Sequence, residues 1–496
     1  MNKITKLVIL LQLLICLPTL VWADELDDYK LFSVGELWDD DRGMHINAHG
    51  GGILFHDGKY YWFGEHKGRE DNAAWVGVTC YSSEDLYDWT YESVALSVEE
   101  DPNSEITAGC LIERPKVIYN PTTGKFVMYF HLELKGQGYK AARVGIASSD
   151  KIEGPYSFIR SCRPNAGVWP MNMSEEQRAS TITSSDLPSE WNEEWRDAVV
   201  NGLYVRRDFQ GGQMSRDMTL YVDDDGKAYH IYASEENRTL HIAELTDDFL
   251  DYSGRYVRVA PGGLNEAPTI FKRKGKYFMI TSGCTGWTPN EARLLSADSI
   301  WGTWTEHPNP CKGFKAETTF YSQGTFILPV QGKEDAFIFM ADRWQPQYPI
   351  NGRYVWLPIN FTEDGLPYLL KYDFWSLSDF RSKPDIDLNE EEVIIKTFPQ
   401  FPGGDKKLYK WLGENMKYPK DAIDEGLSGI VFVKFMIRFD GRIDKNSVRA
   451  IKGKCTRSMI KESERVIQKL PRFTPAMNDD DEPVDCWLIL PINFSL

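Results

Sequence analysis

No CxxC pair occurs anywhere in this chain of 496 residues, although it contains 8 cysteines. Cysteines without that spacing do not predict a zinc site. Long apolar runs are scarce as well, since the one clear run, residues 7–20, is too short for a comfortable membrane span. Positive charge is in deficit, and a net charge of −17 argues against a nucleic-acid partner, because a phosphate backbone attracts basic surfaces.

The N-terminus, MNKITKLVILLQLLICLPTLVWADE, combines two lysines, a short apolar run and a Val-Trp-Ala site before acidic residues. This pattern predicts a secretory signal peptide over residues 1–23, cleaved after Ala23, and therefore an exported protein that is periplasmic or associated with the outer membrane. Cys16 is an alternative lipidation site, although the residues before it are larger than those of a lipobox. Seven cysteines remain after cleavage, so at least one thiol is expected to be free, and Cys80 with Cys110 is one of several pairings that stay open.

A repeated motif organises most of the chain. A Gly-Lys turn precedes an alternating strand in GKYYWFGE (58–65), GKFVMYFH (124–131), GKAYHIYA (226–233) and GKYFMITS (275–282), and EDAFIFMAD (334–342) is a weaker fifth copy. A further strand precedes each copy, and a third strand with an aromatic turn follows it, which predicts hairpins. Five copies of about four short strands predict an all-β fold, a five-bladed β-propeller over residues 32–378.

Residues 160–212, between the second and third copies, are rich in Trp, Ser and charged residues. We expect them to form a long loop that walls one side of a site. Aromatic residues make up 13% of the chain, a content that suits either stacking on sugar rings or the packing of a β-rich core.

The composition changes near residue 380. Residues 379–394 are acidic and polar, which predicts a linker. After it, alternating and amphipathic patterns predict a small α+β domain over residues 395–496. Its expected helices cover 405–416 and 458–470, and its expected strands cover 429–439 and 484–494.

Three carboxylates stand at corresponding places of the predicted blades, next to the inner strand of each. They are Glu113 in IERPKVIYN, Asp217 in SRDMTL and Glu266 in NEAPTI. The inner strands of a propeller surround one axis, so these side chains are expected to converge at one mouth. Glycoside hydrolysis needs a carboxylic acid to protonate the leaving oxygen, and its inverting form needs a base to activate water. The set therefore predicts a glycosidase site.

The RPKVIYN, SRD and NEAP segments, in this order and with the repeats, resemble glycoside hydrolase family 43 over residues 32–378. The stretches INAHGGGILFHDGKYYWFGE and YSQGT are most similar to its exo-β-1,3-galactanase-like branch. The resemblance implies an inverting mechanism with Glu266 as general acid. It also implies that Glu113 is the acidic neighbour that raises the pKa of Glu266 by like-charge repulsion, with Asp217 as a further polar contributor.

One residue of the family pattern is missing. Most of family 43 carries its general base, an aspartate, in the first blade, where this sequence reads Asn47-Ala48-His49. The galactanase-like branch also lacks it, and the resemblance implies that Gln323 in YSQGT activates the water. Two alternatives stay open, namely His49 as the base and a protein without turnover. The residues expected to contact substrate are His49, Asn47, Trp287, Trp344 and Tyr348.

FPGG (401–404), GLSGIVFVKFMIRFDGRI (426–443) and the ending PVDCWLILPINF resemble the C-terminal domain of TonB-type energy transducers over about residues 395–496. The family fold is a small α+β unit whose strand edge can pair with a partner by β-augmentation. A transducer also needs an inner-membrane helix and usually a long Pro-rich arm, and neither is evident in the sequence. We therefore expect a docking or dimerisation module that engages an outer-membrane transporter or a second copy.

Together these patterns predict an exported glycosidase that releases galactose, or arabinofuranose, from plant arabinogalactan-type polysaccharide. The alternative is a non-catalytic glycan-binding propeller that docks to an outer-membrane uptake system. No cofactor is required and no metal-ligating set is predicted, although the family resemblance allows a structural calcium at the propeller axis. The sequence does not specify the sugar, the linkage or the oligomeric state.

Overall fold

The computed structural model describes residues 30–381 and 395–495, except residues 425, 455 and 479. The predicted signal peptide, Cys16 and most of the predicted linker lie outside these residues. The described chain is mostly β-strand with few helices, and each of those helices is too short or too polar to cross a membrane. Two compact units are present, one of Ser33–Asp373 and one that contains Phe374–Leu496.

The first unit contains five antiparallel sheets whose strands follow one another in chain order. Each sheet holds one copy of the sequence repeat as its second strand. Sheet one is β2 (His49–His56), β3 (Lys59–Glu65), β4 (Gly77–Ser83) and β5 (Thr90–Ser97), and sheet two is β6 (Leu111–Asn120), β7 (Lys125–Glu133), β8 (Arg143–Ser149) and β9 (Ser157–Cys162). Sheet three is β10 (Met218–Val222), β11 (Ala228–Ser234), β12 (Thr239–Leu245) and β13 (Tyr252–Val259), and sheet four is β14 (Glu266–Arg273), β15 (Lys276–Ser282), β16 (Ala292–Ala297) and β17 (Thr305–His307). Sheet five is β19 (Gln323–Pro329), β20 (Phe337–Arg343) and β21 (Arg353–Pro358).

The turns between first and second strands explain why the repeats fold as hairpins. Asp57 and Gly58 join β2 to β3 with φ of 47° and 84°, and Lys274 and Gly275 join β14 to β15 with φ of 50° and 80°. Two successive residues at positive φ give a tight turn whose twist matches that of the flanking strands. Glycine at the second position makes this conformation easy to adopt.

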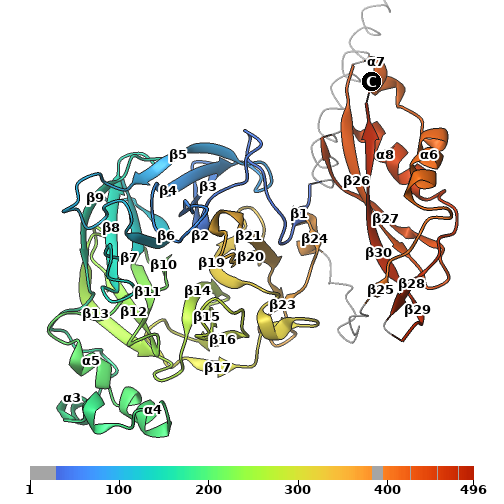
Figure 1. Ribbon diagram of the computed structural model, residues 1–496. Coiled ribbons are helices and arrows are strands. Elements are labelled where there is room, and N and C mark those ends of the chain that lie inside the picture. The colour runs from blue at the N-terminus through green and yellow to red at the C-terminus, as the bar shows by residue number, and fades with distance from the viewer. Residues whose placement is uncertain (1–29, 382–394, 425, 455, 479, 496) are drawn as a thin grey trace, which may run out of the picture. The chain divides into compact units, whose positions relative to one another are not determined.

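The first strands of the five sheets lie together at the centre of the unit (Figure 1). β2, β6, β10, β14 and β19 contact one another in this order, and β19 contacts β2. Separate apolar clusters fill the spaces between sheets one and two, two and three, three and four, and four and five. Between sheets five and one the packing is aromatic, with the Trp62 ring centroid 4.9 Å from that of Trp356 and 4.6 Å from that of Tyr354. Many of the abundant aromatic residues therefore belong to the core.

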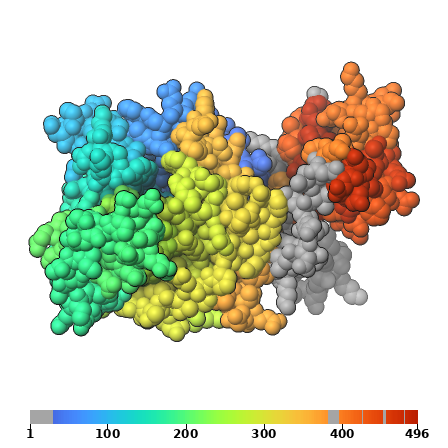
Figure 2. All heavy atoms as spheres, turned by 60° about the horizontal axis from the view of Figure 1, so that its bottom comes forward, coloured from blue at the N-terminus to red at the C-terminus, as the bar shows by residue number. Residues whose placement is uncertain are grey.

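The segment between β9 and β10 differs from the predicted loop, because it contains helices. They are α3 (Glu175–Ala179), η1 (Ser184–Asp186), α4 (Glu193–Val200) and α5 (Leu203–Arg207). Local capping explains them: the Ser174 side chain accepts from the Gln177 N–H, and the Asn192 side chain accepts from the Trp195 N–H. Figure 2 shows this helical insertion (residues 163–212), in green, as a lobe that stands out from the sheets.

The second unit is a small α+β fold, as the sequence predicts. Its main antiparallel sheet has the order β27 (Ile443–Lys454), β26 (Gly429–Ile437), β30 (Cys486–Phe494). A second small sheet contains β25 (Ile395–Thr397), β28 (Ala476–Asn478) and β29 (Pro483–Val484), and the helices are α6 (Asp405–Asn415), α7 (Lys420–Asp424) and α8 (Arg457–Ile467). Helix α8 buries Met459, Ile460, Val466 and Ile467, whose three- and four-residue spacing forms one apolar stripe.

The remaining short elements are β1 (Phe32–Ser33), β18 (Cys311–Lys312), β22 (Asn360–Phe361), β23 (Pro367–Leu370), β24 (Phe374–Trp375), η2 (Ala316–Thr318), η3 (Pro349–Asn351) and η4 (Leu377–Arg381). The cysteines of the described ranges are all free. Cys80 and Cys110 are both buried and unpaired, so the disulfide that the sequence left open does not form.

Candidate active site

The predicted site residues occupy one repeated position of the fold. Glu113, Glu266 and Gln323 each pair with the last positions of the second strand of their own sheet, opposite His131, Ser282 and Asp342 respectively. His49 has the same place in sheet one, opposite Glu65. Asp217 directly precedes β10, and its carbonyl accepts from the Ala233 N–H. The expectation that carboxylates from different repeats reach one place is therefore confirmed for Glu113, Asp217 and Glu266.

A β-bulge follows this position in sheets one, two, four and five, and in sheets one, two and four it ties neighbouring sheets together. The residue after it adopts a left-handed backbone, with φ of 60° at Gly50, 55° at Arg114 and 50° at Ala267. The N–H of each bulge residue then points at a carboxylate of another sheet. The pairs are Gly50 to Asp342 at 2.7 Å, Arg114 to Glu65 at 2.9 Å and Ala267 to Asp217 at 3.1 Å. We call these three contacts the bulge latches.

A cavity of about 340 Å³ opens where these positions meet. It is lined by six predicted residues, namely Glu113, Asp217, Glu266, Gln323, Trp287 and Trp344. The other lining residues are Glu65, Lys67, Arg114, His131, Tyr139, Arg216, Asn237 and Gly286. A second cavity of about 320 Å³ adjoins it and shares Trp287, Trp344 and Gln323. No residue of the helical insertion lines the first cavity, so the insertion does not form the predicted wall.

Glu266 is a carboxyl group whose pKa lies near neutral pH, so a large share of it is protonated there. Burial, and then the neighbouring Asp217 carboxylate, raise its pKa to about 7. Arg114 and a hydrogen bond of 2.6 Å from the Asn237 amide to Glu266 Oε1 act in the opposite direction. The resulting pKa suits a group that must donate a proton at neutral pH.

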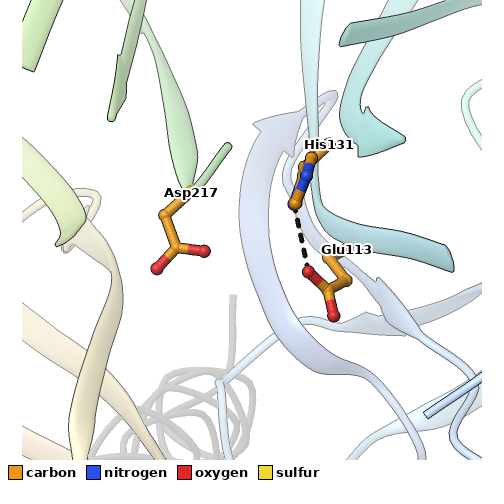
Figure 3. Close-up of side chains that lie close together, drawn as sticks. All are labelled: Glu113, His131 and Asp217. Atoms are coloured by element: carbon orange, nitrogen blue, oxygen red, sulfur yellow. Dashed lines mark ion pairs between the residues drawn. The ribbon is translucent and has the colours of Figure 1, made fainter. Parts of the chain in front are cut away.

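Glu113 has the opposite character. Its Oε2 lies 3.0 Å from His131 Nδ1, and its Oε1 accepts from the Tyr139 hydroxyl at 2.7 Å. Burial alone would raise the pKa of Glu113, but His131, Lys67 and Tyr139 lower it to about 2. His131 lies between Glu113 and Glu133, which raise its pKa to about 9 against the effect of burial. Glu113 is therefore an ionised carboxylate held by a protonated histidine (Figure 3).

The partner that tunes Glu266 differs from the one that the sequence suggests. The like charge that raises the pKa of Glu266 comes from Asp217, whereas Glu113 contacts His131 and Tyr139. Asp217 stays close to Glu266 because Arg114 Nη2 lies 3.1 Å from Asp217 Oδ2 and because the Ala267 N–H donates to the same oxygen. The tuning role predicted for Glu113 therefore stays a prediction, and the carboxylate whose charge chiefly raises the pKa of Glu266 is Asp217.

The Gln323 amide oxygen accepts two hydrogen bonds, and its nitrogen donates one. Its Oε1 accepts from Arg114 Nη2 at 2.5 Å and from the Trp344 indole N–H at 2.9 Å, and its Nε2 donates to Ser282 Oγ at 2.9 Å. An amide oxygen has two lone pairs, and both are used. Gln323 is thus a fixed, polarised group at the cavity wall, with no free acceptor site for a proton from water.

His49 and Asn47 do not reach the cavity, which corrects their predicted roles. The His49 ring is fully buried, stacks on Tyr354 with centroids 5.4 Å apart, and has a pKa lowered well below its usual value by burial. Asn47 clamps the peptide of Lys67: it donates to the Lys67 carbonyl at 3.0 Å and accepts from the Lys67 N–H at 2.8 Å. His49 therefore cannot activate water, and Asn47 supports the site from behind.

Of the three aromatic residues predicted to contact substrate, two line the cavities and one does not. Trp287 and Trp344 line both cavities, with ring centroids 6.1 Å apart and planes at 74°. Trp287 is 45% exposed and can offer a ring face to a sugar. Tyr348 lies outside both cavities and is 53% exposed, so its predicted substrate contact has no support from its position.

Several lining residues escaped the sequence analysis. His131 ends the copy GKFVMYFH, where the first copy ends in Glu65, so a comparison of the last residue in each copy points to both. Arg114 follows Glu113 directly and reaches both Asp217 and Gln323. Lys67, which ion-pairs with Glu65, carries no such signal.

A metal ion does not suit the one cluster of the described residues that has the spacing for it. Atoms of Glu113, His131 and Asp217 lie within 4.8 Å of one another. His131 carries a proton on account of its two carboxylate neighbours, and Asp217 is paired with Arg114. A ligand histidine must be neutral, so the group is better described as an internal charge network. Nearby, the buried Lys116 side chain donates to the Gly50 carbonyl at 2.9 Å, and burial lowers the pKa of its amine to about 7.

Comparison with known proteins gives two family matches. The model of Glycosyl hydrolases family 43 matches residues 161–367, and that of the Gram-negative bacterial TonB protein C-terminal matches residues 414–496. Among solved structures, the chain is similar to a family 43 β-1,3-galactosidase with galactodeoxynojirimycin, at 54% identity and a TM-score of 0.69, covering 70% of this chain and 100% of that one. It is also similar to an exo-β-1,3-galactanase from Clostridium thermocellum, at 35% identity and a TM-score of 0.56, covering 74% of this chain and 70% of that one.

Among curated proteins, a segment of 112 residues is 28% identical to a β-D-galactofuranosidase from Aspergillus niger. The segment is 22% of this chain and 30% of that relative, so the similarity spans less than a third of the relative's length.

Proposed function

The chain belongs to glycosyl hydrolases family 43, and we propose that it is an exported glycosidase that releases terminal β-galactosyl residues from β-1,3-linked galactan of the arabinogalactan type. The β-1,3-galactosidase whose whole length it matches supports galactose over arabinofuranose as the released sugar. Family 43 proteins are five-bladed β-propellers, and the five sheets around one centre agree with that architecture.

One observation supports the mechanism: Glu266 and Glu113 line the same cavity, and their surroundings shift the pKa values of the two carboxyl groups in opposite directions. The pKa of Glu266 is raised to about 7, while that of Glu113 is lowered to about 2. Such a separation assigns acid and base roles. Glu266 gives its proton to the glycosidic oxygen as the bond to the anomeric carbon breaks, and the ionised Glu113 accepts a proton from the attacking water.

This chain departs from the common family pattern in the residue that activates water, because no aspartate stands at residues 47–49. Glu113 is the stronger candidate base, because an ionised carboxylate keeps acceptor sites beyond the contacts with His131 and Tyr139, whereas the Gln323 amide oxygen already accepts two hydrogen bonds. We assign Gln323 the orientation of sugar or water through its fixed amide. Attack from the face opposite Glu266 inverts the anomeric centre.

A direct assay decides between hydrolysis and simple binding. Incubation with β-1,3-galactobiose, followed by proton NMR at early times, is expected to show α-galactose as first product. Glu266→Gln is expected to lose about a hundredfold or more in kcat, the usual contribution of a general acid. Tight binding of galactan without product in the native protein would instead support a non-catalytic glycan receptor. A Gln323→Ala loss far larger than that of Glu113→Gln would move the base role to Gln323.

For the second unit we propose a docking role in the envelope of a Gram-negative cell. The family match covers residues 414–496, and β30 pairs on one side with β26 while no described strand pairs with its other edge. An open edge can accept a strand from an outer-membrane transporter or from a second copy. Sedimentation of the purified protein separates self-association from a monomer that awaits a transporter.

A further inference from the structure

The hairpin between β11 and β12 contains three consecutive non-glycine residues with left-handed backbones. They are Glu235, Glu236 and Asn237, with φ of 52°, 58° and 61°. L-residues rarely adopt this conformation, and a run of three persists only where the surroundings impose it. At the end of the run, the Asn237 amide donates to Glu266 Oε1 at 2.6 Å. The last residue of the constrained run is therefore hydrogen-bonded to Glu266, the carboxyl group to which we assign the acid role.

A buried ion pair fixes the base of this hairpin. Glu235 is fully buried and receives two hydrogen bonds from Arg258 on β13, from Nε to Oε1 at 2.7 Å and from Nη2 to Oε2 at 2.7 Å. His241 adds a contact from Nε2 to Oε1 at 2.9 Å. A two-point arginine–carboxylate pair is strongly directional, so it sets the orientation of the Glu235 backbone as well as its charge.

The same arginine reaches the helical insertion. Arg258 Nη1 donates to the Val200 carbonyl at 2.9 Å, and Nη2 donates to the Val199 carbonyl at 2.5 Å, at the C-terminal end of α4. A cation is favoured at this end of a helix, where carbonyls lack partners. The backbone of Arg258 also exchanges two hydrogen bonds with the Asn172 side chain, at 3.0 Å and 2.8 Å. Arg258 therefore joins the insertion to the hairpin.

A second tie reaches the middle of the hairpin. Arg207, the last residue of α5, places Nη1 3.0 Å from Glu236 Oε1. Its side chain is 41% exposed, so this tie is weaker than the buried one, and the same guanidinium also pairs with Asp208 at 2.7 Å. The insertion thus holds two successive residues of the hairpin, although none of its residues lines the cavity.

We propose that the helical insertion is a positioning element for the catalytic acid: through Arg258 and Arg207 it holds the hairpin that places Asn237 against Glu266. The proposal rests on the proposed role of Glu266. Asn237 fixes Oε1 and thereby the orientation of the Glu266 carboxyl group. A general acid acts only from a defined position, because a small displacement removes it from hydrogen-bonding reach. Arg258, Glu235 and Asn237 are positioning residues in this scheme.

Two substrates separate acid positioning from a general structural effect. Hydrolysis of β-1,3-galactobiose needs protonation of the leaving sugar, whereas dinitrophenyl β-galactoside releases a stable phenolate without it. Arg258→Met and Asn237→Ala are expected to lose about tenfold or more in kcat on galactobiose and to change by less than about threefold on the dinitrophenyl substrate. Arg258→Lys, which keeps the charge but not the two-point geometry, is expected to fall between.

The matched control is Arg255→Met on the same strand, whose side chain pairs with Glu244 at 3.1 Å rather than with Glu235. This variant is expected to keep the native kcat on both substrates. If Arg258→Met does not fold, Arg207→Met decides the matter, with a smaller but equally selective loss on galactobiose. Equal losses on both substrates, or no loss in Asn237→Ala, overturn the proposal. Glu266→Gln reports separately: if that variant shows no such selectivity, the acid assignment fails, whatever the insertion does.

Discussion

Replacing Glu266 with glutamine is expected to stabilise the fold at alkaline pH while it removes activity. The pKa of Glu266 is about 7 in the folded chain against an ordinary value of 4.5. An acid whose pKa is raised by folding stabilises the fold only while it is protonated. That contribution is complete below about pH 4.5 and is lost as the pH rises through about 7. Glutamine is neutral at every pH, so its contribution to the stability of the fold does not fall as the pH rises.

The size of the effect follows from the same values. One pKa unit corresponds to about 1.4 kcal/mol, so the rise from 4.5 to about 7 is worth about 3 kcal/mol. Glu266 is only partly exposed, so most of this free energy is retained despite screening by solvent. Compared with the native protein, Glu266→Gln should therefore have a free energy of unfolding about 3 kcal/mol higher at about pH 8 and nearly unchanged at about pH 4.

Urea unfolding followed by tryptophan fluorescence, at both pH values, measures this difference. Glu100→Gln, at an exposed loop position, is the control and is expected to change neither value. A gain of equal size at both pH values would show that glutamine merely packs better. No gain at about pH 8 would show that Glu266 is not held in a high-pKa environment, and the assigned proton donor would then have to be another group.

Four further outcomes are expected. Asp217→Asn removes the like charge that raises the pKa of Glu266, so the alkaline limb of the kcat profile should move to lower pH by about one unit, and a limb that stays in place contradicts the assigned cause. Gly64→Ala places a methyl group 2.1 Å from the Ala48 backbone and should lower the free energy of unfolding by at least about 2 kcal/mol in urea titrations. Gly413→Ala in α6 meets open space and should raise the stability of the second unit by about 0.5–1 kcal/mol, as measured by hydrogen exchange in α6. A chain that ends at Asp373 should keep kcat and KM within about twofold, because the cavity belongs to the first unit, and a larger change would implicate the second unit in catalysis.

The sequence was informative wherever structure depends on local signals. The Gly-Lys turns specify hairpins by themselves, so the five repeats correspond to five sheets. Because each repeat folds in the same way, Glu113 and Glu266 share one register position, and their convergence follows from the repeat. Helices α6 and α8 of the second unit were predicted for the same reason, since apolar spacing along a helix is also local, whereas the short α7 was not predicted.

The errors concern contacts between distant segments. His49 was a reasonable base by chemistry, but its burial depends on Tyr354, from another sheet. The neighbour of Glu266 is decided by Arg114, which holds Asp217 in place across the cavity. No spacing in the sequence reports such a contact. The helices of the insertion are a different case, since the capping pair Ser174 and Gln177 was available as a local signal.

The bulge latches also determine when the site can first exist during synthesis. Gly50 must wait for Asp342, its hydrogen-bond acceptor, which is translated 292 residues later. Until the fifth sheet emerges from the ribosome and packs against the first, the Gly50 N–H lacks its acceptor Asp342. The cavity also lacks Gln323, one of its lining residues. A nascent chain that already carries Glu113 and Glu266 is therefore inactive. Release of sugar by this chain would therefore report that the last sheet has packed against the first.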